Sequence, residues 1–129
     1  MPIRFRYDRD RDLLLQVAEG TVGLSDVEEA RATRTEAGVP TPTAFCLIDF
    51  RGIQLDVTPQ DLRRLEKEGM HIEPPARRTA ILTDEARVTA MSLMWKGMQS
   101  PTRAVEVFST RDAAYRWLGV EARENDLDI

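Results

Sequence analysis

The segment from Ala44 to Asp49 constrains the fold more than any other part of this 129-residue chain. Every residue from Ala44 to Ile48 is apolar, so a strand built from this segment has apolar side chains on both faces. Such a strand has to be covered on both sides, which is the environment of a central strand in a parallel sheet. We therefore predict that this segment is the centre of a mostly parallel sheet.

Strand and helix signals alternate along the rest of the chain. Residues 3–7 and 13–17 flank a polar turn and favour an antiparallel hairpin. The order that follows, β-β-α-β-α-β-α-β-α, predicts an α/β fold with a mostly parallel open sheet, right-handed crossovers and an N-terminal antiparallel hairpin. Glu106 lies in the middle of the last strand, so we expect that strand at a sheet edge.

Two helices carry explicit start signals. Ser25 and Glu28 have the spacing of a capping box, so we expect the first helix to begin at Ser25. The inward arc of that helix is only weakly apolar and includes Arg34. Thr58 and Pro59 combine an N-cap hydroxyl with proline at the first helical position, which predicts a helix from there.

The composition fits one globular domain, with 42% hydrophobic and 31% charged residues. We assign residues 1–120 to that domain. Residues 121–129 hold four acids without a hydrophobic period, so we expect a frayed acidic tail there.

Charge and hydropathy indicate which kinds of partner and which cellular compartment to expect. The net charge is −4 with both signs interleaved, so nucleic acid is not an expected partner. No apolar run approaches the length of a membrane span, and the N-terminus lacks the apolar core of a signal peptide. The lone Cys46 cannot form an internal disulfide. We therefore expect a cytoplasmic protein without membrane insertion.

Catalytic motifs are missing from the sequence. It has no glycine-rich phosphate loop, and one His and one Cys cannot supply metal-ligand spacing, so we expect neither cofactor nor metal. An enzyme is not expected. The alternative is a small hydrolase or isomerase that uses Asp49 with His71 as a proton carrier, although a surface role is the simpler interpretation of His71.

The candidate binding residues cluster after the central strand. Asp49 ends that strand at the edge where open α/β sheets bind ligands, although Asp49 can equally pair with Arg51. Asp56 and Thr58 follow at the start of the next helix. The Thr58 hydroxyl serves either as an N-cap or as a phosphorylation site, where the helix dipole would stabilise the phosphate.

A stripe of soft apolar side chains marks the third helix. It consists of Met91, Met94, Trp95 and Met98. Such a stripe is usually core, but if exposed it would suit an apolar ligand or the partner of a homodimer.

Residues 47–65, which include Asp49, Arg51, Asp56 and Thr58, resemble the STAS or SpoIIAA-like superfamily, in particular its uncharacterised bacterial STAS/SEC14-type branch. The order of elements resembles that group over residues 3–119. The resemblance implies a right-handed β/α superhelix with a regulatory surface at Asp56 and Thr58. Phosphorylatable members, the anti-sigma-factor antagonists, carry glycines after the corresponding hydroxyl, and this chain lacks them.

Together these observations favour a non-enzymatic, STAS-like binding or regulatory module that takes a protein partner or a small ligand near Thr58. One alternative is a phosphorylation-switched antagonist with Thr58 as the phosphosite. Another is a carrier of a lipid or other apolar ligand, suggested by the SEC14-type resemblance and the methionine stripe.

Overall fold

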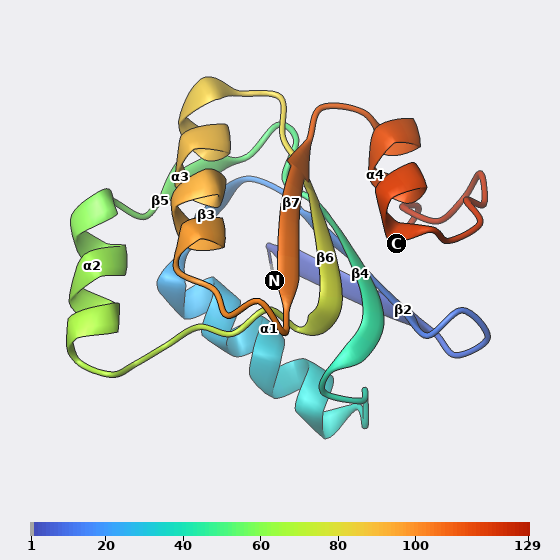
Figure 1. Cartoon of the computed structure of the whole chain (residues 1–129), viewed down its shortest axis with the longest axis horizontal. Helices are drawn as coiled ribbons and strands as arrows, with labels where there is room; N and C mark the ends of the chain where they lie inside the picture. Colours follow the sequence, from blue (N-terminus) through green and yellow to red (C-terminus); the bar gives the residue numbers. More distant parts are fainter. Residues whose placement is uncertain (1) are drawn as a thin grey trace.

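The computed structural model describes residues 2–129 and places five strands in one sheet, in the order β1-β2-β4-β6-β7 (Figure 1). β1 pairs antiparallel with β2, and the other three pairs are parallel. The mostly parallel α/β sheet with an N-terminal hairpin is therefore confirmed. The strands are β1 (Ile3–Asp8), β2 (Leu13–Ala18), β4 (Thr43–Asp49), β6 (Ala76–Leu82) and β7 (Ala104–Phe108).

A second, two-stranded parallel sheet pairs β3 (Thr21–Gly23) with β5 (Gln54–Asp56). The sequence patterns did not predict it, because three residues are too few to show the alternation of a strand.

β4 lies between β2 and β6 at the centre of the main sheet, as its two apolar faces predict. Leu47 faces the helix α4 (Arg111–Leu118), which contributes Ala114 and Leu118 to the same core cluster. Cys46 and Ile48 lie in a separate cluster on the opposite face. Both faces of β4 are thus buried, but by different elements.

The other helices are α1 (Leu24–Glu36), α2 (Pro59–Lys67) and α3 (Ala86–Gly97). Ala30 of α1 and Val88 of α3 share one cluster with Ala18 of β2, so both helices cover the face opposite α4. α2 stands outside this layer and packs against α3 (Figure 1). No helix within residues 2–129 is long and apolar enough to cross a membrane.

α1 begins at Leu24, and its cap is Gly23, two residues before the predicted cap Ser25. The Gly23 N–H donates to Asp26 Oδ2 over 2.8 Å. Glu28, the expected partner of Ser25, instead pairs with Arg31 over 2.9 Å. The reason is that β3 extends to Gly23, so the helix starts directly after the strand and Asp26 takes the capping position.

β7 occupies the sheet edge opposite β1, which confirms its predicted position. Glu106 is partly exposed and pairs with Lys96 of α3 over 2.7 Å. Glu106 lies in the middle of a strand, and a charged side chain there needs water or a cation. An edge strand gives this carboxylate access to both.

The expectation of a frayed tail is wrong, because Asp126 is anchored with 1% of its surface exposed. Arg11, from the β1–β2 turn, donates to both carboxylate oxygens of Asp126 over 2.6 and 2.9 Å. The Tyr115 hydroxyl and the Arg123 backbone N–H donate to the same carboxylate. Composition identified an acidic tail but could not reveal a cation 115 residues away.

The hydrogen bonds also set the charge state of Asp126. Burial alone would raise the pKa of this carboxyl, but the hydrogen bonds from Arg11 and Tyr115 outweigh burial and hold the pKa below its usual 3.8. Burial and the bond to Asp126 raise the pKa of Tyr115 to about 12. The cluster is therefore an ionised aspartate held by a cation and a neutral phenol.

Replacing this aspartate tests whether the tail is part of the folded core. Asp126→Asn leaves Arg11 paired with Asp8 alone and removes the charge to which Arg11 and Tyr115 donate, so it should lower the free energy of unfolding by about 1.5–3 kcal/mol. Asp128→Asn, at an exposed position of the same tail, should change it by less than about 0.5 kcal/mol. Urea denaturation measures both variants, and equal stabilities would show that the tail is loose.

The same carboxylate predicts acid sensitivity. Its pKa is lower in the folded chain than the usual 3.8, so the unfolded chain takes up the proton first. The stability it contributes is complete well above pH 3.8 and is lost as the pH falls below that value. We expect the wild type to lose more stability between pH 6 and pH 3 than Asp126→Asn does in urea denaturation. Equal losses would contradict the assignment.

Candidate functional site

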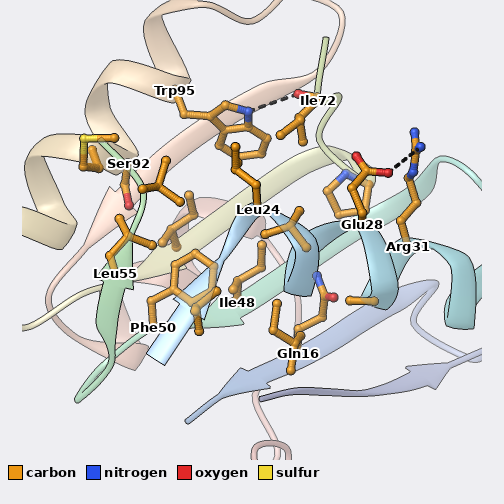
Figure 2. Close-up of a pocket in the computed structure, with 18 of the residues that line it drawn as sticks. Gln16, Leu24, Glu28, Arg31, Ile48, Phe50, Leu55, Ile72, Ser92 and Trp95 are labelled. Atoms are coloured by element: carbon orange, nitrogen blue, oxygen red, sulfur yellow. Dashed lines mark hydrogen bonds and ion pairs between the residues drawn. The ribbon is translucent and has the colours of Figure 1, made fainter. Parts of the chain in front are cut away.

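A cavity of about 140 Å³ lies between α1, α3 and the main sheet (Figure 2). Most of the side chains that line it are apolar. They include Ile48 and Ile81 from the sheet, Leu24, Val27 and Ala30 from α1, and Met91 and Trp95 from α3. The cavity therefore forms where the two helices that cover this face of the sheet diverge.

Segments beyond the two helices complete the wall. Phe50, Leu55 and Val57 line the cavity from the chain between β4 and α2, and Figure 2 shows Phe50 and Leu55 side by side at one end. The Trp95 indole N–H donates to the Ile72 carbonyl over 3.0 Å. This bond fixes the indole across the cavity from the sheet.

Charged residues mark the mouth of the cavity, and most are already paired. Glu28 and Arg31 are both exposed and form an ion pair at 2.9 Å (Figure 2). Glu73, also exposed, pairs with Arg103 over 3.0 Å. These charges meet solvent, so the cavity opens on this side.

A polar group lies deeper, on the sheet side of the cavity. Gln16 of β2 is only 4% exposed, and its Oε1 accepts from Arg34 Nη1 over 2.7 Å. The Gln16 amide N–H donates to the Cys46 sulfur over 3.6 Å. Burial lowers the pKa of Arg34, and the positive charge of Arg31 lowers it further, yet a guanidinium stays protonated in proteins.

Cys46 cannot act as a nucleophile in this structure. Its side chain is fully buried in β4, and burial raises the pKa of the thiol to about 12. The thiolate is the reactive form of cysteine, and at neutral pH it is almost absent at such a pKa.

Asp49 and Arg51 are brought together, but not at the cavity. Arg51 donates from Nε and Nη2 to the two oxygens of Asp49 over 2.9 and 3.0 Å. The bidentate pair occupies the carboxylate, and neither residue lines the cavity. Asp49 therefore forms the ion pair with Arg51 that the sequence analysis gave as the alternative to ligand binding.

Thr58 is the N-cap of α2, as its sequence context predicts. Its Oγ1 accepts from the Asp61 N–H over 3.2 Å, and its own N–H donates to Asp61 Oδ2 over 2.9 Å. Thr58 and Asp56 are exposed, whereas the intervening Val57 is buried and lines the cavity. Phosphorylation of Thr58 and binding at Asp56 stay predictions.

His71 and Asp49 do not share a site. His71 is exposed in the loop after α2 and lines a small pocket of about 10 Å³ beside Trp95 and Met98. Asp49 lines neither this pocket nor the larger cavity. Over residues 2–129 no group of three or more His, Cys, Asp or Glu side chains is placed to hold a metal ion.

The methionine stripe of α3 is packed rather than exposed. Met91 is buried, while Met94, Trp95 and Met98 are partly buried in the cluster that joins α3 to Leu62 of α2. Met91 and Trp95 also line the cavity. The stripe therefore serves as core and as cavity wall, and the homodimer stays a prediction.

Sequence reasoning missed the polar pair Gln16 and Arg34. Two signals were present: a glutamine inside the apolar run of β2, and an arginine on the inward arc of α1. Neither predicted a contact, because the pairing of a helix residue with a strand residue depends on how the helix packs on the sheet.

Comparison with known proteins establishes the fold. An uncharacterised protein of the DUF3478 family from Shewanella loihica PV-4, described as having a SpoIIAA-like fold, superposes with a TM-score of 0.59 at 20% identity. The match covers 90% of this chain and 93% of that one. No family model matches the sequence, and no curated protein matches it either. The chain has a SpoIIAA-like fold, as the sequence resemblance implied.

The capping role of Thr58 can be measured directly. Thr58→Ala removes the acceptor of the Asp61 N–H and should lower the free energy of unfolding by about 1 kcal/mol. Thr58→Ser and Thr58→Asp keep an oxygen at the cap and should be nearly neutral. An alanine variant as stable as the wild type in urea denaturation would show that this cap contributes nothing.

Proposed function

We propose that this chain is a non-enzymatic binding module that takes one small, mostly apolar ligand into the cavity between α1, α3 and the sheet. The observation that supports the proposal is the 140 Å³ of space lined by apolar side chains. An engineered apolar cavity of about 150 Å³ in another protein binds benzene. By that measure the cavity takes a ligand with roughly six to ten non-hydrogen atoms.

The apolar wall supports an occupant for this space. The cavity opens to solvent at its mouth, so its apolar wall is left in contact with water that an apolar ligand would displace. The wall of this cavity includes Trp95 and Phe50, whose large faces gain the most from contact. A small apolar ligand would make those contacts and leave water outside.

The reactive side chains of the chain support binding rather than catalysis. Cys46 is buried as a thiol, Asp49 is paired with Arg51, and His71 lies outside the cavity. Ser92 is the hydroxyl of the cavity wall, and within residues 2–129 no histidine is among the residues that line the cavity with it. We propose further that the module works in the cytoplasm, where its single cysteine would remain reduced.

Filling the cavity tests the proposal. Leu24 extends from α1 toward Trp95 (Figure 2), so Leu24→Trp should occupy the space and block a ligand. Leu93→Trp is the matched control, because Leu93 lies on α3 with 48% of its surface exposed and does not line the cavity.

We expect toluene to shift the backbone amide NMR signals of residues around the cavity in the wild type and in Leu93→Trp. The same titration of Leu24→Trp should leave those signals unchanged. If toluene causes no shifts in the wild type, or equal shifts in Leu24→Trp, the cavity is not a binding site.

A further inference from the structure

Arg34 differs from the other charged residues of the cavity wall. Glu28 is paired with Arg31 and Glu73 with Arg103, but Arg34 forms no ion pair with any carboxylate in residues 2–129. Its only side-chain hydrogen bond in that range is from Nη1 to Gln16. One unpaired cation therefore borders a cavity whose wall is mostly apolar.

Arg34 is held in place by a buried residue of the cavity wall. Gln16 is 96% buried, lines the same cavity and holds one end of the guanidinium. A guanidinium carries five N–H donors, so most of those of Arg34 remain without a protein acceptor. Arg34 is partly buried and no carboxylate balances its charge, so an anion in the cavity would find free donors on its guanidinium.

The helix dipole alone does not account for the same facts. Arg34 lies in the last turn of α1, where a cation interacts favourably with the helix dipole. An arginine that points into water, as the exposed Arg31 does one turn earlier, can interact with the helix dipole equally well. That interaction requires neither the partial burial of Arg34 nor its hydrogen bond to the buried Gln16.

We propose that the ligand of the cavity is a small monocarboxylate, whose carboxylate pairs with Arg34 and whose apolar part lies against Ile48, Met91 and Trp95. This inference rests on the proposed function, since it names the class of ligand for the same cavity. The planar guanidinium matches a carboxylate through two parallel hydrogen bonds.

Charge balance favours a monoanion over a more highly charged ligand. Arg34 is the one unpaired cation among the residues that line the cavity, over residues 2–129. Glu28 and Glu73 stand at the mouth, and the chain as a whole carries a net charge of −4. A dianion would meet one positive charge and an acidic surface, whereas a monocarboxylate is matched by Arg34 alone.

The test compares hexanoate with hexanamide, two probes of equal chain length that differ in charge. The variant is Arg34→Met, which keeps an unbranched side chain and removes the charge. Arg87→Met is the control, because Arg87 is exposed on α3, outside the cavity, and loses the same charge. Arg34→Lys restores a cation without the planar fork.

We expect the wild type and Arg87→Met to bind hexanoate roughly tenfold more tightly than hexanamide in calorimetric titrations. Arg34→Met should bind the two probes equally, with its affinity for hexanamide unchanged, and Arg34→Lys should recover part of the preference. Thermal melts and toluene titration of Arg34→Met verify that it is folded and that its cavity is open.

Three outcomes would overturn the inference. If the wild type binds hexanamide and toluene but shows no preference for hexanoate, the monocarboxylate is wrong while the proposed binding function stands. If Arg87→Met loses the preference as fully as Arg34→Met, the effect comes from overall charge and not from the cavity. If neither probe nor toluene binds the wild type, both the inference and the proposed function fail.

Discussion

Coverage of both faces of β4 is the constraint on which the rest of the structure depends. Three helices cover the main sheet, and α2 packs on α3 instead. α4 has only eight residues, so Leu127 and Ile129 of the tail add to its cluster. On the other face, α1 and α3 together cover the sheet. The space that they leave between them is the cavity. On each face the helices leave part of the sheet uncovered. The tail fills that part beside α4, and the cavity occupies it between α1 and α3.

Local sequence patterns predicted the parts of the fold that local chemistry determines. Alternating or continuous apolar runs identified the strands of the main sheet, and Thr58 with Pro59 identified the start of α2. The patterns failed where a distant contact decides the outcome. The contact of Asp126 with Arg11 spans 115 residues, and the start of α1 depends on the pairing of β3 with β5. The cavity follows from the spacing of two helices, which no local period encodes.

The segment that resembles the STAS superfamily divides into two environments in the structure. Asp56 and Thr58 face solvent, while Val57 between them belongs to the cavity wall. The sequence resemblance directed attention to the exposed residues of this segment. Its buried residue lines the same cavity as Gln16 and Arg34, which are hydrogen-bonded to each other.

The two edges of the main sheet bear on how copies of this chain behave at high concentration. A free strand edge offers unpaired N–H and C=O groups to any second strand, which is the first step of cross-β aggregation. β1 presents the exposed cations Arg4 and Arg6, and β7 is five residues long with the Glu106–Lys96 pair beside it. Charged side chains on an edge strand and a short edge strand both limit edge-to-edge pairing, although Arg4 and Arg6 are already paired with Glu19 and Asp126. Charge and strand length at its two edges therefore disfavour extension of the sheet by a second copy of the chain.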